Sequence, residues 1–175
     1  FGFDIEYGEE EGDYDYTYID DFTMDVYEDS TGYYYADEYS INYNTMSRPE
    51  YEYDFYENDT IEITKYNGSE TELEIPAEID GKKVVSIGYN AFSKYDDKFD
   101  EDRSNLKSVI IPGSVTRIRS EAFKNCPDLA NITIPSSVKF IEEGAFKGTE
   151  WLENKQDEDP LVIVNGILID GTKCK

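Results

Sequence analysis

The chain has 175 residues, of which 40 are acidic, 16 are basic and none is histidine, so its net charge is -24. This charge excludes nucleic acid and anionic membranes as partners, because proteins bind both through Lys and Arg side chains. The absence of histidine removes Ser–His and Cys–His nucleophilic pairs and histidine metal ligands, and carboxylate pairs are too numerous to indicate a glycosidase site. We predict that the chain is not an enzyme and that it has no metal site and no cofactor.

Length and cysteine content bound the domain organisation. A chain of 175 residues predicts one domain with room for an appendage. Cys126 and Cys174 are too few for a disulfide-stapled miniprotein. The chain begins at Phe1 and shows neither a signal peptide nor an apolar run of about 18 residues. We expect a mature secreted product or an excised piece, with no membrane insertion in this segment.

Residues 1–50 form an acidic, tyrosine-rich leader that differs in composition from the rest. They contain 15 acidic residues, one basic residue and 10 tyrosines. Their like charge favours an extended, solvated linker, whereas a regular alternation of aromatic and apolar residues favours strands in a small β appendage. The alternating residues are Tyr14, Tyr16, Tyr18, Phe22, Met24 and Val26. The β alternative includes a hairpin from Phe22 to Ile41 with its turn at residues 29–32.

The carboxylates of the leader also raise the question of calcium, which takes six to eight oxygen ligands. The chain contains no D-x-[DN]-x-[DN]-G loop that ends in Glu. We therefore favour a solvating or partner-contacting acidic tail over a specific calcium site. The acidic loop at residues 96–102 is likewise predicted to be a solvated loop.

After the leader, residues 51–55 and 61–63 alternate apolar and polar side chains around a turn at residues 57–60, which predicts a β-hairpin. The hairpin lies immediately before a set of internal repeats. A solenoid needs a cover for the open end of its core, so we predict that this hairpin is an N-terminal cap. The predicted covering residues are Tyr51, Tyr53, Phe55, Ile61 and Ile63.

One sequence motif, the repeated phrase of this chain, occurs twice with a spacing of 23 residues, at residues 106–123 and 129–146. Both copies follow L-x-x-[VI]-x-I-P-x-S-V-x-x-I-x-x-x-A-F, and a divergent copy at residues 73–92 precedes them. A period in the twenties predicts a stacked solenoid in which no repeat can bury its apolar face alone. The divergent copy carries insertions at residues 77–83 and 93–105, which keep the apolar positions in register and therefore belong on loops.

The repeated apolar positions are predicted to face the core. Val109 and Ile111 alternate on a short strand, and Pro112 ends the strand because it lacks an N–H donor. Stacking would place equivalent strands about 4.8 Å apart in one parallel sheet. The remaining inward positions of this copy are Leu106, Val115, Ile118, Ala122 and Phe123. The last four are predicted to lie on the segment that turns the chain back after the strand. The phenylalanines of the three copies are predicted to form an aromatic ladder of Phe92, Phe123 and Phe146.

The outward strand positions are the candidate ligand-binding site. A sheet that presents a short grid of side chains is the surface with which solenoids bind extended partners. A small grid with one exposed apolar residue is equally compatible with plain surface. The candidates on this concave face are Glu72, Glu74, Ser108, Ile110, Asn131 and Thr133.

The C-terminal segment changes character after the last repeat. Asn165-Gly166 between two apolar runs is a strong signal for a two-residue turn, because both central residues need a positive φ. Residues 162–169 are therefore predicted to form a β-hairpin. Trp151 and Leu152 are predicted to pack beneath it as core residues.

The repeated pattern, with Asn125-Cys126 leading into the next Leu129, resembles the BspA-type (Treponema-type) leucine-rich repeat of bacterial surface and secreted proteins. Residues 75–82 and 151–169 also resemble recurrent segments of that family. The resemblance implies a β-rich leucine-rich-repeat solenoid with short parallel strands and about three repeats. It implies an extracellular or cell-surface setting and a binding or adhesion role, supplies no catalytic residues, and makes Cys126 a buried structural thiol.

Two functional hypotheses remain open for the two predicted regions, an acidic leader at residues 1–50 and a repeat domain at residues 51–175. In the first, the chain is a non-catalytic module that recognises a protein or polysaccharide through the repeat sheet and its loops. In the second, it is a structural spacer that displays other domains. Saturable binding to one partner would distinguish the first hypothesis from the second.

Overall fold

The computed structural model describes residues 23–27, 36–38, 41–46, 49–93 and 105–174. By its internal contacts the chain divides into two compact units, residues 1–46 and residues 47–175. The smaller unit contains most of the acidic leader. The larger unit contains all three copies of the repeated phrase.

In the smaller unit, β1 (Thr23–Tyr27) pairs with β2 (Asn42–Met46) in parallel. The predicted hairpin from Phe22 to Ile41 is therefore wrong, because parallel strands cannot be joined by a tight turn. The proposed turn at residues 29–32 lies outside the described residues, as do the three alternating tyrosines before residue 20. Alternation identified a strand at β1, but it carries no information about the direction of the partner strand.

The larger unit begins with the predicted hairpin, which the structure confirms. Strands β3 (Tyr51–Phe55) and β4 (Thr60–Tyr66) pair antiparallel, and the 3-10 turn η1 (Glu57–Asp59) joins them. The ring of Tyr51 lies 5.2 Å from that of Tyr66, centroid to centroid. Phe55, which was expected to help cover the core, is instead 70% exposed. The role of the hairpin as a cap stays a prediction.

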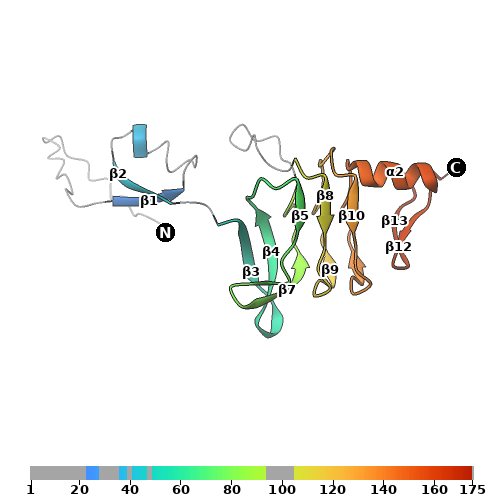
Figure 1. The fold of residues 1–175 in the computed structure, drawn as a ribbon, viewed down its shortest axis with the longest axis horizontal. Coiled ribbons are helices and arrows are strands. Elements are labelled where there is room, and N and C mark those ends of the chain that lie inside the picture. The colour runs from blue at the N-terminus through green and yellow to red at the C-terminus, as the bar shows by residue number, and fades with distance from the viewer. Residues whose placement is uncertain (1–22, 28–35, 39–40, 47–48, 94–104, 175) are drawn as a thin grey trace, which may run out of the picture. The chain divides into compact units, whose positions relative to one another are not determined.

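The repeats build two parallel sheets, and each repeat contributes one strand to each (Figure 1). The first sheet has the order β10-β8-β5, with β5 at Glu72–Glu74, β8 at Ser108–Ile110 and β10 at Asn131–Thr133. The second sheet has the order β11-β9-β7-β4-β3, with β7 at Lys82–Ile87, β9 at Arg117–Ile118 and β11 at Phe140–Ile141. The N-terminal hairpin thus belongs to the second sheet, where β4 pairs with β7 in parallel.

The sequence predicted only one sheet, and the second sheet is a correction. The expectation was that Val115 and Ile118 simply return the chain, but Ile118 lies on β9 and pairs with Ile87 of β7. Strands of two residues are too short to show an alternating pattern. The insertion at residues 77–83 also contributes to this sheet, because β6 (Glu78–Ile79) pairs antiparallel with β7. The insertion at residues 93–105 falls almost entirely outside the described residues.

The core lies between the two sheets, and the predicted inward positions of the second copy are all buried. The predicted aromatic ladder is confirmed, with ring centroids 4.9 Å apart for Phe92 and Phe123 and 5.7 Å apart for Phe123 and Phe146. The stack is longer than predicted, because Tyr66 lies 5.3 Å from Phe92 at one end and Trp151 lies 4.9 Å from Phe146 at the other.

The segment that leads from the second sheet back to the first uses left-handed backbone at the same place in every copy. The residue immediately before each Ala-Phe pair has a positive φ, which is 56° at Asn90, 58° at Glu121 and 71° at Gly144. A second such residue follows each of the last two phenylalanines, with φ 58° at Asn125 and 76° at Gly148. Asn and Gly adopt this conformation with little strain, whereas Glu does so only under tertiary constraint.

The C-terminal segment contains the predicted hairpin and one helix that the sequence analysis missed. Strands β12 (Val162–Val164) and β13 (Ile167–Asp170) pair antiparallel around Asn165 and Gly166, whose φ values of 52° and 78° confirm the predicted turn. Helix α2 (Glu150–Glu158) precedes them, and its first turn buries Trp151 and Leu152 as predicted. The signal for the helix was Thr149, whose side chain accepts a hydrogen bond from the N–H of Leu152 at 3.1 Å.

Candidate binding surface

The structure brings all six predicted site residues together on the outer side of the first sheet. They stand in two rows that cross the three strands, and we call this set the first-sheet face. One row runs through Glu72, Ser108 and Asn131, and the other through Glu74, Ile110 and Thr133. The central residue of each strand, such as Val109 of β8, points into the core instead. Strand alternation therefore produced the predicted grid, with neighbouring strands about 4.8 Å apart.

The polar side chains of the first-sheet face have no hydrogen-bonding or ion-pair partners among the residues that the structure describes. Among the residues that the structure describes, none of the five polar side chains in this set makes a hydrogen bond or ion pair. Ile110, in the middle of the grid, is 44% exposed although it is a large apolar residue. The face thus presents unused donors and acceptors around an apolar centre, so a partner can bind without displacing internal contacts.

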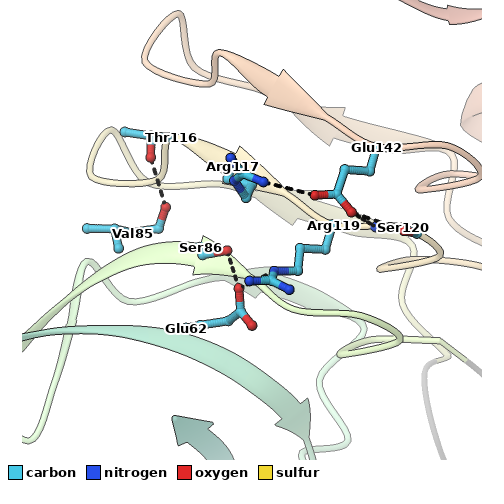
Figure 2. A network of polar contacts seen from close by, with 8 residues as sticks. All are labelled: Glu62, Val85, Ser86, Thr116, Arg117, Arg119, Ser120 and Glu142. Atoms are coloured by element: carbon cyan, nitrogen blue, oxygen red, sulfur yellow. Dashed lines mark hydrogen bonds and ion pairs between the residues drawn. The ribbon is translucent and has the colours of Figure 1, made fainter. Parts of the chain in front are cut away.

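The outer side of the second sheet is different, because its polar side chains bind one another (Figure 2). We call this set the second-sheet network; its members are Glu62, Ser86, Arg117, Arg119, Ser120 and Glu142. In its first half, the hydroxyl of Ser86 donates to Oε2 of Glu62 at 2.6 Å, and Nε of Arg119 lies 2.7 Å from the same oxygen. The side chain of Glu62 is only 12% exposed. This ion pair joins the N-terminal hairpin to the second copy across β7.

In the other half of the network, Nη1 of Arg117 donates to Oε1 of Glu142 at 3.1 Å. The N–H and the hydroxyl of Ser120 donate to Oε2 of the same carboxylate at 3.1 and 3.0 Å. The guanidinium of Arg117 also lies 4.8 Å from the ring centroid of Phe140. These contacts join the second copy to the third.

The network shifts the pKa values of Glu142 and Arg119 toward the ionised forms. Burial alone would raise the pKa of Glu142, but the hydrogen bonds from Ser120 and the charge of Arg117 outweigh it and lower that pKa. Burial alone would lower the pKa of Arg119, but the charge of Glu62 and hydrogen bonding to Tyr56 and Glu62 raise it. The network therefore stabilises charges that burial would otherwise disfavour.

Sequence analysis missed the second-sheet network. Four of its members, Ser86, Arg117, Arg119 and Glu142, occupy the variable positions on either side of the inward Ile of a copy, as in Arg117-Ile118-Arg119. The corresponding pairs are Ser86 and Gly88 in the first copy and Phe140 and Glu142 in the third. Two basic residues flanking one inward Ile in a strongly acidic chain were a usable signal for an outward-facing ion-pair site.

A cavity of about 360 Å³ lies at the C-terminal end, between the last repeat, α2 and β13. Its apolar wall includes Phe146, Leu152 and Ile169. Its polar wall includes Asp170, whose Oδ1 accepts hydrogen bonds from Gln156 at 2.9 Å and from the N–H and hydroxyl of Thr172, both at 2.8 Å. These three donors converge on one oxygen and hold the carboxylate of Asp170 in place at the wall of the cavity.

Neither a metal cluster nor a membrane-spanning helix occurs among the residues that the structure describes. No group of three or more His, Cys, Asp or Glu side chains is placed to hold a metal ion within the described ranges. Over the same ranges, no helix has both the length and the apolar character that a membrane span requires. Cys126 is buried, as the resemblance implied, and its thiol donates to the backbone oxygen of Phe92 at 3.2 Å, while Cys174 is exposed.

Comparison with known proteins identifies the repeats. Residues 86–156 match the family model described as BspA type leucine rich repeat region (6 copies). Among proteins of curated function, none matches the sequence.

Among solved structures, the chain is similar to a leucine rich cell surface protein from Faecalibacterium prausnitzii, with 34% identity and a TM-score of 0.50 over 59% of this chain and 27% of that one. It is also similar to a leucine-rich-repeat protein of T. pallidum, with 30% identity and a TM-score of 0.49 over 59% of this chain and 46% of that one. The chain therefore spans less than half the length of either relative. The resemblance found in the repeated motif is confirmed, because residues 86–156 match the model of that same repeat family.

Proposed function

We propose that the chain is a non-catalytic recognition module of a bacterial surface or secreted protein, and that it binds a partner through the first-sheet face. Leucine-rich-repeat regions of this type support protein interaction in general. The cell-surface description of the similar Faecalibacterium prausnitzii protein supports an extracellular setting for this chain, and we propose an adhesion role in that setting. The partner is a protein or a polysaccharide.

One observation carries this proposal, namely the contrast between the two outer faces. On the outer side of the second sheet, Arg117 and Arg119 are engaged in ion pairs with Glu142 and Glu62. The outward polar groups of the first sheet, including Asn131 and Thr133, have no partner among the described residues. A protein surface that keeps its hydrogen-bonding groups free around an exposed apolar residue has the composition of a binding site, with Ile110 as the apolar centre.

The proposal is tested by a binding screen followed by substitution. The whole chain is screened against plant cell-wall polysaccharides, other glycans and host matrix proteins for saturable, competable binding at micromolar concentrations. Asn131→Ala combined with Thr133→Ala, and separately Ile110→Ser, should abolish the binding that is found and leave the thermal midpoint unchanged. Binding that survives both variants would refute the assignment of this face.

The alternative function is a structural spacer that displays other domains. It is favoured by the second-sheet network, because ion pairs between neighbouring copies resist bending of the solenoid. The alternative predicts that the screen finds no saturable ligand. Any competable binding that depends on the first-sheet face would exclude a purely structural role.

A further inference from the structure

Strand β5 lies at one end of the first sheet, and its outer edge is unpaired in the part of the chain that the structure describes. The other edge bonds to β8: the N–H of Lys107 donates to the oxygen of Thr71 at 2.7 Å, and the N–H of Ile75 donates to the last residue of β8 at 3.0 Å. Backbone groups alternate in direction along a strand, so those of Glu72 and Glu74 point to the unpaired edge. This edge offers a row of free donors and acceptors.

The same two residues give the edge its charge. Glu72 and Glu74 are exposed, their side chains belong to the first-sheet face, and no residue of that face is basic. A strand added at this edge would place the Cβ atoms of its outward residues about 4.5–5.5 Å from those of Glu72 and Glu74, within reach of the two carboxylates. Opposite charges at that distance attract and like charges repel, so the edge discriminates among incoming strands by charge.

We propose that the open edge of β5 accepts an extended segment of a partner protein by strand addition, and that this segment carries Lys or Arg at alternating positions. The basic side chains lie beside Glu72 and Glu74, and the residues between them are small and apolar because they face the core side of the sheet. Strand addition obtains affinity from backbone hydrogen bonds and specificity from alternate side chains. This inference rests on the proposed function, since it names the partner class for the same face.

The charge of the whole chain supports the same choice of partner. A net charge of -24 repels acidic segments and a second copy of this chain at long range, and it attracts basic segments. Short length and like charge are also the means by which proteins protect an edge strand from self-association. The acidic charge that disfavours pairing of this edge with a second copy of the chain therefore favours pairing with a basic segment. Ile110, on the adjacent strand, is exposed and offers that segment an apolar contact.

The inference is tested with a labelled synthetic peptide in which Lys alternates with Val and Thr, titrated into the whole chain and followed by fluorescence anisotropy. We expect saturable binding that weakens as salt is raised from about 50 mM to about 300 mM. Peptides with Gln or Glu in place of Lys should bind more weakly or not at all. The backbone amides of Glu72 and Glu74 should become protected from hydrogen exchange when the Lys peptide is bound.

Matched variants separate local recognition from general attraction to an acidic protein. Glu72→Gln combined with Glu74→Gln should weaken binding of the Lys peptide about fivefold or more. Asp128→Asn combined with Glu143→Gln changes the net charge equally at exposed positions outside the face and should leave binding unchanged. Equal losses in the two double variants, or equal binding of a peptide with the same lysines placed consecutively, would overturn the inference.

The outcomes also distinguish this inference from the proposed function. If Ile110→Ser abolishes binding of a partner from the screen but Glu72→Gln with Glu74→Gln has no effect on it, the first-sheet face is a binding site without charge selection. The function then stands and the strand-addition inference fails. If no partner and no peptide depends on the face, both fail.

Discussion

The two sheets of the solenoid are built from the same repeats, yet their outer faces differ in how their polar side chains are used. In the second-sheet network, Glu62, Arg117, Arg119 and Glu142 pair with one another across the copies. On the first-sheet face, the corresponding polar side chains pair with nothing in the described part of the chain. The comparison separates two roles: charged side chains that are paired hold repeats together, and polar side chains that are free remain available to a partner.

The largest expected effect concerns the core that both faces share. Phe123→Ala removes the middle ring of the aromatic ladder, which is fully buried between Phe92 and Phe146. We expect the free energy of unfolding to fall by about 3–5 kcal/mol, as for other buried phenylalanines. Urea denaturation measures it. Phe140→Ala is the matched control, because this ring is 56% exposed on the second sheet, and a comparable loss there would show that the core assignment is wrong.

The next effect tests the second-sheet network. Arg119→Ala leaves Glu62 nearly buried without its cation, and we expect the free energy of unfolding to fall by about 1–3 kcal/mol. Replacing Glu62 in the same chain by Ala should recover part of that loss in a double-mutant cycle.

The comparison predicts a different result on the first-sheet face. Asn131→Ala should change the free energy of unfolding by no more than about 0.5 kcal/mol, since its side chain has no partner among the described residues. If Arg119→Ala and Asn131→Ala had equal effects on denaturation, the distinction between the two faces would be lost.

A smaller effect tests the backbone that joins the two sheets. Gly144 has φ 71°, and a Cβ there would meet its nearest neighbour, Glu121, at an ordinary 3.6 Å. Gly144→Ala therefore isolates the strain of left-handed backbone, and we expect a loss of about 1 kcal/mol in thermal denaturation. Gly113→Ala is the control, because it lies in open space without a positive φ. A loss in the control as large as that at Gly144 would contradict the conformational explanation.

The smallest effect is the pH dependence of the Arg117–Glu142 half of the network. Folding lowers the pKa of the Glu142 carboxyl below the value of a glutamate in the unfolded chain, which is about 4.3. The stability that the ionised carboxylate contributes is therefore fully present above that unfolded pKa, and it is lost as the pH falls through the lower pKa of the folded state. Glu142→Gln should therefore destabilise the chain at neutral pH, and the difference from the parent should shrink in acid. Chemical denaturation at several pH values measures it.

Glu143→Gln provides the control for this titration. The side chain of Glu143 is exposed and has no partner among the described residues, so this variant should stay close to the parent at every pH. A pH-independent loss at Glu142→Gln would show that packing, not charge, holds that carboxylate.

Much of the repeat architecture could be predicted because it depends on short sequence patterns that recur in each copy. In the second copy, Val109 and Ile111 are inward residues two positions apart, and the other copies have apolar residues at the same positions. The first sheet and its outward grid could therefore be predicted from a period of two. The Asn165-Gly166 turn followed from the φ values that such a turn demands. These features depend on residues close together in the sequence, and repetition made the patterns visible.

The features that escaped prediction depend on residues that meet only after folding. β1 and β2 pair in parallel although alternation suggested a hairpin, because side-chain pattern does not specify strand direction. In the second and third copies, the strands of the second sheet, β9 and β11, are too short to show a period. The ion pair of Arg119 with Glu62 joins residues from different elements across β7, and no spacing rule connects them.

The sequence by itself determined the repeat family, the apolar core and the outward position of the first-sheet face, because each follows from the period of a local pattern. Tertiary structure alone decided which outward side chains are paired and which are free, since that depends on the register between copies and on the second sheet. It also left one edge of β5 unpaired within the described residues. The candidate site was therefore locatable from sequence, whereas its contrast with the second-sheet network required the stacked repeats.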